Sequence, residues 1–79
     1  MKKLRFFTTH GCHLCEQAEL LLDALQDKYS FEVEIVDIAT DEDLVREYGL
    51  SIPVLLHIES DELLYWPFDT RDILNLLEK

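Results

Sequence analysis

Hydrophobic residues in the first third of the chain follow a strand pattern and then a helical one. The segment 4–8 is rich in aromatic and β-branched side chains, and the His10 and Gly11 that follow it are typical of a tight turn. Beyond the turn, apolar residues recur every three or four positions, as on one face of a helix. These residues are Leu14, Ala18, Leu21, Leu22 and Leu25. We predict a strand over 4–8 and an amphipathic helix over 14–25, with this stripe inward and the acidic side chains in water.

The middle of the chain predicts a strand and a short helix. The segment 31–35 alternates apolar residues with glutamates, and 36–38 continues it, which predicts a strand with one face in water. Charged side chains on such a strand are typical of a sheet edge, where they discourage pairing with other chains. Thr40 and Asp43 resemble a capping box that opens a short helix, and Gly49 is expected to end it.

The last third predicts two strands and a helix. The segment 54–58 is almost wholly apolar, as expected of a strand that is buried on both faces. Residues 60–61 predict a turn, and 63–65 a partner strand. Asp69 or Thr70 can then cap a last helix. The inward residues of that helix are expected to be Ile73, Leu74, Leu76 and Leu77.

The predicted elements follow the order strand, helix, strand, helix, strand, strand, helix. Strands that alternate with helices are expected to pair in parallel through right-handed crossovers, and the closely spaced final pair is expected to form an antiparallel hairpin. The sequence therefore predicts an α/β fold with a four-stranded mixed sheet covered by three helices. Because 79 residues are too few for two cores, residues 1–79 are expected to form a single domain.

Composition and charge exclude several classes of function. Hydrophobic residues make up 48% of the chain, which fits a globular fold rather than a disordered one. Seventeen Asp and Glu against seven Lys and Arg give a formal net charge of −10, which repels nucleic acids and anionic membranes. No segment resembles a signal peptide or a membrane span. We expect a cytoplasmic monomer that binds neither nucleic acid nor membranes.

The two cysteines, Cys12 and Cys15, stand where the first strand gives way to the first helix. At positions i and i+3 they lie on one side of the first turn, close enough to form a disulfide. Such a bond cannot join distant segments, so the pair is expected to be chemical rather than structural. Free backbone N–H groups and the helix dipole favour a thiolate, most of all at Cys12. We predict thiol–disulfide exchange in which Cys12 attacks and Cys15 resolves the mixed disulfide.

Three ionisable residues could affect the predicted site, and His13 is the one expected to support it. His13, when cationic, would stabilise the neighbouring thiolate, whereas Glu16 would oppose a thiolate at Cys15. Asp37 follows the second strand and is expected to cap the strand end rather than to transfer protons under Cys15.

The segment 10–15, His-Gly-Cys-His-Leu-Cys, together with Ile52-Pro53 before a later strand, resembles glutaredoxins and thioredoxins over nearly the whole chain. The chain is most similar to short bacterial glutaredoxin-like proteins with a Gly-Cys-x-Leu-Cys start and a Tyr-Gly-x-x-x-Pro-Val segment, here 48–54. The resemblance implies a glutaredoxin-like thioredoxin fold of order βαβαββα. It also implies that Pro53 is cis and lies against the cysteines, and that Ile52 offers backbone groups to an extended substrate. The substrate would be a protein or small-molecule disulfide, and a reductase or glutathione would recycle the pair.

The chain departs from glutathione-binding glutaredoxins in two places. Those proteins typically have a Lys just before the first cysteine and a Gly-Gly pair after the fourth strand. Here Thr9 stands near the Lys position, and 65–69 replaces the glycines, so the backbone cannot approach a ligand as closely. The departures argue against glutathione specificity, and no tightly bound cofactor is expected. Trp66 and Phe68 either offer an apolar surface to a protein substrate or, as is more common, cap the core.

Two alternatives remain open. Cys12 and Cys15 could ligate zinc or an iron–sulfur cluster with histidines as further donors, since zinc accepts both sulfur and imidazole. Against this, the chain has no second Cys-x-x-Cys, and His57 is expected to be a satisfied sheet histidine. The other alternative is a module of the same fold that binds partners or senses redox state with little turnover. The reactivity of Cys12 separates these alternatives from a catalyst, which needs that thiol ionised near neutral pH.

Overall fold

The architecture follows from a computed structural model that describes residues 2–79. The chain forms β1 (Lys2–Thr8), α1 (His13–Gln26), β2 (Phe31–Asp37), the 3-10 turn η1 (Ile38–Thr40), α2 (Glu42–Tyr48), β3 (Val54–His57), β4 (Glu62–Tyr65) and α3 (Thr70–Leu77). The predicted order βαβαββα and the α/β fold class are confirmed.

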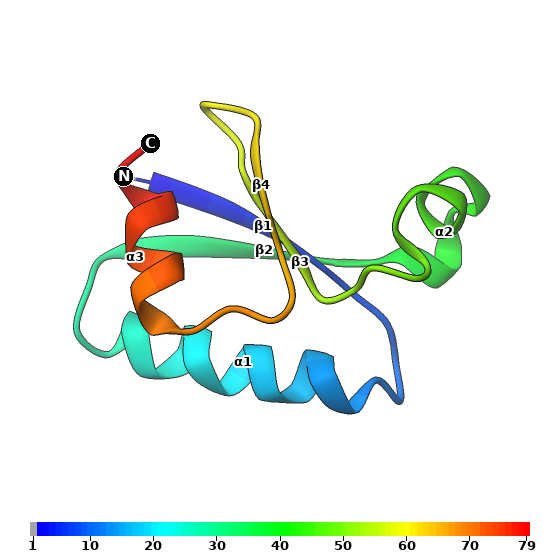
Figure 1. Ribbon diagram of the computed structural model, residues 1–79, viewed down its shortest axis with the longest axis horizontal. Helices are drawn as coiled ribbons and strands as arrows, with labels where there is room; N and C mark the ends of the chain where they lie inside the picture. Colours follow the sequence, from blue (N-terminus) through cyan, green and yellow to red (C-terminus); the bar gives the residue numbers. More distant parts are fainter. Residues whose placement is uncertain (1) are drawn as a thin grey trace.

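The four strands form one mixed sheet in the order β2-β1-β3-β4 (Figure 1). β1 and β2 are parallel, whereas β3 runs antiparallel to both β1 and β4. The edge position predicted for the strand that contains the glutamates is confirmed, because β2 has a neighbour on one side only.

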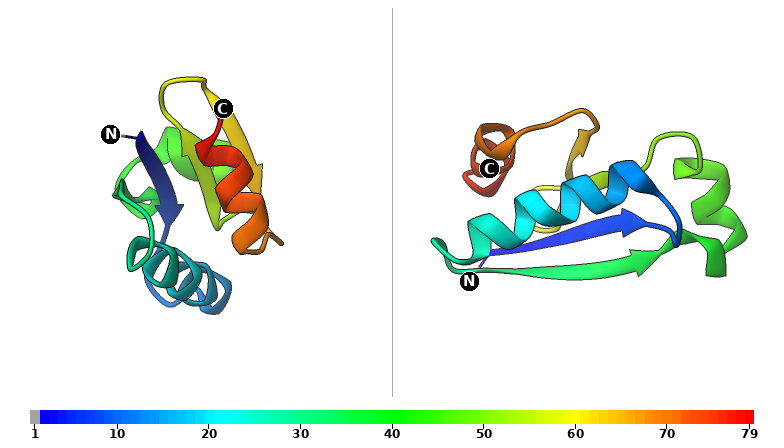
Figure 2. Two further views of the ribbon diagram at one scale, coloured as in Figure 1. Left: turned by 90° about the vertical axis from the view of Figure 1, so that its left-hand side faces the viewer. Right: turned by 90° about the horizontal axis from the view of Figure 1, so that it is seen from below.

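The parallel pairing predicted after the second helix is wrong, and the placement of α2 explains why. The seven-residue α2 has no fully buried residue and stands at the end of the sheet where β1 and β2 finish (Figure 2). The chain therefore re-enters the sheet from the end at which it left, and β3 must run back against β1. Consequently α1 and α3 cover one face of the sheet, whereas α2 contacts only the end of the other face, through Leu44 and Tyr48.

The main core lies between the sheet and the two covering helices. Because side chains alternate along a strand, Leu4 and Phe6 of β1 face α1 and α3, and Leu55 joins them from β3. Of the predicted stripe on α1, Ala18, Leu22 and Leu25 are buried and Leu21 is partly buried, but Leu14 is 44% exposed. In α3, Ile73, Leu76 and Leu77 are buried and Leu74 is partly buried. The apolar pattern thus identified the core except at the first turn of α1.

The opposite face of the sheet carries a small apolar cluster and a charged patch. Phe7 stacks on Tyr48, the last residue of α2, with ring centroids 4.4 Å apart. Arg5 Nε donates to Glu34 Oε1 at 3.0 Å, and Lys3 Nζ lies 3.6 Å from Glu34 Oε2. The hydrogen bond from the Arg5 guanidinium holds the pKa of Glu34 below its ordinary value. This face is therefore partly in water.

The caps of the two short helices differ from each other in how well they follow the predictions. In α2 the cap is Asp41, whose side chain accepts from the N–H groups of Asp43 and Leu44. The predicted Thr40 cap is wrong because η1 takes up Thr40, whose hydroxyl donates to the Asp37 carbonyl at 3.0 Å.

No helix among residues 2–79 has the length and hydrophobicity needed to cross a lipid bilayer.

Asp69 begins α3 with a reciprocal capping box. Its side chain accepts from the Asp72 N–H at 3.0 Å, and its own N–H donates to Asp72 Oδ2 at 3.0 Å. The hydrogen bond from the Asp72 backbone is the main reason why the pKa of Asp69 lies below its ordinary value. Of the two predicted candidates for this cap, Asp69 is therefore the one used.

Replacing Asp69 with alanine is expected to lower the thermal midpoint by several degrees, because the cap of a core helix is lost. A carboxyl whose pKa is lowered by folding stabilises the protein above the ordinary pKa of aspartate, about 4, and loses that effect as pH falls through the folded value. The difference in midpoint between wild type and Asp69→Ala should therefore shrink in acid. Circular dichroism melts at several pH values measure it. Thr70→Ala is the control and should change the midpoint less; a difference that stays constant in acid would contradict the role of the carboxylate.

Candidate active site

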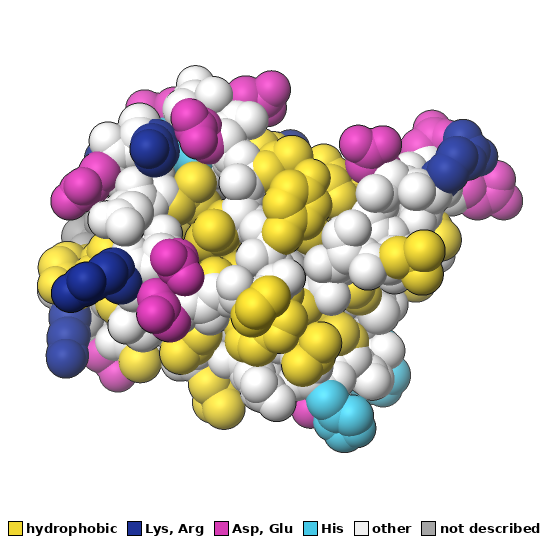
Figure 3. All heavy atoms as spheres, in the orientation of Figure 1, with side chains coloured by type: hydrophobic (Ala, Val, Ile, Leu, Met, Phe, Trp, Pro, Cys, Tyr) yellow, Lys and Arg dark blue, Asp and Glu magenta, His cyan; other side chains and the backbone are white. Residues whose placement is uncertain are grey.

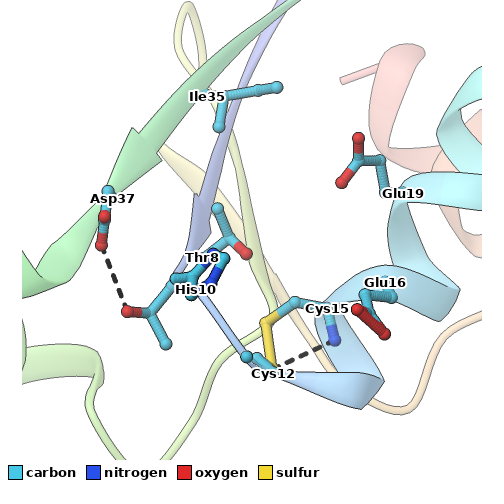
Figure 4. A pocket seen from close by; sticks show the side chains of 10 residues that line it. Thr8, His10, Cys12, Cys15, Glu16, Glu19, Ile35 and Asp37 are labelled. Carbon is cyan, nitrogen blue, oxygen red and sulfur yellow. Dashed lines mark hydrogen bonds between the residues drawn. A yellow bond between two sulfur atoms is a disulfide. The ribbon is translucent and has the colours of Figure 1, made fainter.

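Cys12 and Cys15 lie at the N-terminal end of α1, after the turn that follows β1 (Figure 4). They form a disulfide, and their Cα atoms are 5.2 Å apart. Cys12 is the N-cap residue, and its Sγ accepts a hydrogen bond from the Cys15 backbone N–H at 3.1 Å. Gly11 precedes it with φ of +80°, a conformation that favours glycine because a Cβ would be strained there. The strand-to-helix turn thus brings both sulfurs to the start of the helix.

The two cysteines differ sharply in exposure. Cys15 is 2% exposed and belongs to the main core, whereas Cys12 is partly exposed and packs only against the edge of that core. A reagent in solution therefore meets the sulfur of Cys12 first.

The ionisable residues predicted near the cysteines stand at the solvent boundary. His13 Nδ1 lies 3.4 Å from Glu16 Oε2, and the two side chains are 92% and 67% exposed. Water screens the effect of either on the sulfurs. Asp37 caps η1, as predicted: it accepts from the Ala39 N–H at 2.9 Å and from the Thr9 hydroxyl at 3.2 Å (Figure 4).

A cavity of about 460 Å³ opens beside the disulfide. Both cysteines line it, together with His10 from the turn after β1, Glu16 and Glu19 from α1, and Asp37 from the end of β2. Sequence reasoning did not place Glu19 or Asp37 near the sulfurs, because the first sits on a face that is otherwise solvated and the second lies on another strand.

A groove of about 290 Å³ lies next to the disulfide end of α1. It is lined by Leu14, Leu50, Ser51, Ile52, Tyr65 and Trp66. Leu50 is fully exposed, and Leu14 and Tyr65 are 44% and 49% exposed. Figure 3 shows hydrophobic side chains gathered on the middle of this face, near the histidines. Leu14, predicted to face the core, instead lies in this groove. Leu50 could have been found as an apolar residue in a loop, and Tyr65 as an aromatic residue at the end of a short strand.

Of the two aromatic residues after β4, one packs in the core and the other lies partly at the surface. Trp66 packs edge to face on Phe68, with ring centroids 5.0 Å apart. Phe68 is buried in the main core, whereas Trp66 remains partly exposed and lines the groove. Pro53 is buried beside the partly buried Ile52, and the peptide bond between them is cis, as is the one between Trp66 and Pro67.

His57, considered as a metal ligand, lies far from the cysteines. His57 pairs with Leu4 and Glu62 at the end of the sheet away from the cysteines and is fully buried. Its Nδ1 accepts from the Ser60 N–H at 3.2 Å and lies 2.7 Å from Ser60 Oγ, so it ties down the β3–β4 turn; its Nε2 has no hydrogen-bond partner in the described chain. Within residues 2–79, no three His, Cys, Asp or Glu side chains are grouped as metal ligands.

Comparison with known families decides which kind of protein carries this site. A family model described as Glutaredoxin-like domain (DUF836) matches residues 3–78. The chain belongs to this glutaredoxin-like family. The expected resemblance is thereby confirmed over almost the whole length. None of the curated proteins compared with this glutaredoxin-like chain matches it.

Solved structures agree with the family. A structural-genomics target protein from X. campestris is 35% identical, with 95% of each chain covered and a TM-score of 0.77. A protein from Nitrosomonas europaea is 36% identical, covering 94% of this chain and 88% of its own, with a TM-score of 0.79. Thioredoxin 1 from Thermosipho africanus is 12% identical, covering 96% and 90% of the two chains at a TM-score of 0.72, and shows the thioredoxin fold alone. The glutaredoxin-like fold and the Cys12–Cys15 pair together fit a redox function.

Proposed function

We propose that this glutaredoxin-like protein is a thiol–disulfide oxidoreductase in which Cys12 attacks and Cys15 resolves. The observation that carries the proposal is the asymmetry of the pair. The Cys12 sulfur is partly exposed and accepts the Cys15 N–H at 3.1 Å, whereas the Cys15 sulfur belongs to the core. In the reduced protein the same N–H and the positive end of the helix dipole favour a thiolate at Cys12.

The exchange proceeds in two displacements. The Cys12 thiolate attacks one sulfur of a substrate disulfide, the substrate S–S bond breaks, and the other half leaves as a thiolate. Cys15 then loses its proton and its sulfur attacks Cys12 Sγ, which releases the second substrate thiolate and forms the Cys12–Cys15 disulfide. The Cα separation of 5.2 Å permits that ring closure within one helical turn. Two electrons pass to the substrate, and a reductase or glutathione must supply two electrons to restart the cycle.

The groove next to the disulfide end of α1 supports a role for Ile52 and Trp66 in holding the substrate. Both residues line it, and Pro53 is buried directly after Ile52. Apolar side chains on the surface suit a peptide segment that flanks a disulfide better than they suit a small polar thiol. The substrate is a protein or small-molecule disulfide, of which the groove favours the protein one. The cytoplasm, which keeps thiols reduced, is the compartment in which such a dithiol works.

Alkylation of the reduced protein tests the proposal. Cys12 is expected to react with iodoacetamide at least about 10-fold faster than Cys15 near neutral pH, with a midpoint below the value of about 8.5 for a free thiol. Mass spectrometry of each cysteine over a pH series gives both numbers. The same protein in denaturant is the control, since both cysteines should then react alike. Equal rates in the folded protein, or a Cys12 midpoint like that of a free thiol, would reject the catalyst.

Recycling is tested on the same sample. A redox titration followed by a glutathione-dependent and a thioredoxin-reductase-dependent assay identifies the reductant. Thr9 donates to Asp37 in this chain, and residues 65–69 carry no glycine, so the reductase assay is expected to be the faster one.

A further inference from the structure

The ionisable side chains that line the cavity beside the disulfide are mainly carboxylates. Glu16, Glu19 and Asp37 line the cavity together with both cysteines. Figure 4 shows Glu16 near the disulfide at the start of α1, Glu19 further along the same helix, and Asp37 at the end of β2 on the other side of the cavity. Among the described residues that line the cavity, none is Lys or Arg, and His10 is the only base.

Several of the positive side chains are already paired elsewhere. Lys3 and Arg5 pair with Glu34 across β1 and β2, and Arg46 pairs with Asp43 on α2. The whole chain carries a formal net charge of −10. Local and overall charge therefore have the same sign, and the potential in the cavity is negative.

The placement of the sulfurs makes this potential matter for the reaction. Both cysteines line the acidic cavity, whereas neither lines the groove that contains Leu14 and Trp66. A substrate disulfide must bring one sulfur up to Cys12 Sγ, so the chemical groups next to that sulfur enter the cavity. In addition, the leaving thiolate develops its negative charge in the cavity that these carboxylates line, and their partly screened charges disfavour an anionic leaving group more than a cationic one.

We propose that the cavity selects disulfides with an ammonium or guanidinium group near the attacked sulfur and disfavours anionic ones, glutathione disulfide included. The inference rests on the proposed exchange function and adds a substrate class to it. Such a disulfide is either that of a small aminothiol or a basic segment of a protein. In both cases Cys12 and Cys15 are oxidised to their disulfide while the substrate is reduced to two thiols.

Glu19 is the specificity-determining residue that the structure offers for a test. Glu16 lies 3.4 Å from His13, and Asp37 is held by Thr9 and by the Ala39 N–H. Within residues 2–79, by contrast, Glu19 takes part in none of the ion pairs or side-chain hydrogen bonds, and it is exposed on α1. Its charge can therefore be changed without removing a structural contact.

The first experiment compares three small disulfides of similar size: dicationic cystamine, neutral 2-hydroxyethyl disulfide and dianionic 3,3′-dithiodipropionate. The reduced protein is mixed with each at about pH 8, where an ordinary histidine is neutral. Each oxidation rate is divided by the rate of free dithiothreitol with the same disulfide, which removes intrinsic reactivity. Cystamine is expected to react about 10-fold faster than the dianion at low salt, and the ratio should fall several-fold in about 1 M salt, where the screening length is about 3 Å.

The second experiment separates the cavity from the net charge. Glu19→Lys should reduce the preference for cystamine to near unity or reverse it. Glu59→Lys is the matched control, because Glu59 lies in the β3–β4 turn at the other end of the sheet and changes the net charge by the same amount. Equal effects of the two variants would overturn the proposal, as would equal normalised rates for the three disulfides. Circular dichroism checks that both variants fold.

A pair of peptide disulfides distinguishes the two sources of the cationic group. The peptides are identical except for Arg or Glu beside the cysteine, and the Arg peptide is expected to react faster. A larger preference here than in the small-molecule series identifies a basic protein segment, and a smaller one identifies a small aminothiol. If the reduced wild-type protein reacts with none of these disulfides faster than the reduced Cys12→Ser protein does, the exchange function itself fails. That result differs from a loss of charge preference.

Discussion

Replacing Cys12 with serine is expected to abolish disulfide exchange, whereas replacing Cys15 with serine should leave the substrate trapped on Cys12. A serine hydroxyl cannot form the mixed disulfide, so the first variant should fall to the background rate. In the second variant the first displacement still occurs, but the buried thiol that would release the substrate is missing. Mass spectrometry without reductant, after incubation with a disulfide substrate, measures the adduct: none for Cys12→Ser, and close to one per chain for Cys15→Ser.

Two controls protect this result from a folding artefact. Serine at position 15 puts a hydroxyl into the core, where an unpaired polar group costs about 1–3 kcal/mol. Cys15→Ala avoids that cost and should trap the same adduct. Thermal melts of each variant establish that it is folded under the assay conditions. An adduct on Cys15 in the Cys12→Ser protein would instead reverse the assigned roles.

Periodicity was sufficient for the order of elements but not for the direction of every strand. The apolar pattern of 14–25 and of 54–58 reports which face of an element is buried, a property that each element carries in its own sequence. The direction of β3 depends on whether α2 crosses the sheet, and that is decided by packing between segments far apart in the chain. The apolar residues of α2 predict a helix with one partly buried face, and that pattern fits both a crossover and a helix that stands at the sheet end.

At the site, too, local features could be predicted from the sequence, whereas features that depend on packing between distant segments could not. Cys12 and Cys15 could be found because their chemistry needs only two residues on one helical turn. Leu14 continues the apolar stripe of α1, which predicts a core residue, yet it is 44% exposed and lines the groove instead. Glu19 and Asp37 line the same cavity as the sulfurs only because α1 packs beside the end of β2. The carboxylates to which we attribute substrate preference could therefore not be predicted from the sequence.

The disulfide of this protein joins residues only three apart, so it cannot bring distant segments together. The four strands and the two covering helices must be held by apolar packing instead. Phe6 is at the centre of that packing: it is fully buried on β1, between β2 and β3, and shares the main core with Cys15 and Ala18. Removing the Phe6 ring would leave a cavity in the core between the sheet and α1, and would weaken the packing that holds the cysteine pair in place.

Phe6→Ala is therefore expected to lower the free energy of unfolding by about 3–5 kcal/mol, the range for removing a fully buried aromatic ring. A domain of this length has a total of roughly 4–12 kcal/mol, so the variant should lose a large fraction of its stability. Urea unfolding followed by circular dichroism measures the change. Tyr29→Ala, at a ring that is 49% exposed, is the control and should cost less than about 1 kcal/mol. Reduction of the wild-type disulfide should also cost less than Phe6→Ala, because the loop it closes is so short. If reduction proved the more damaging of the two, the disulfide would be structural, and the case for a pair free to cycle between its two redox states would weaken.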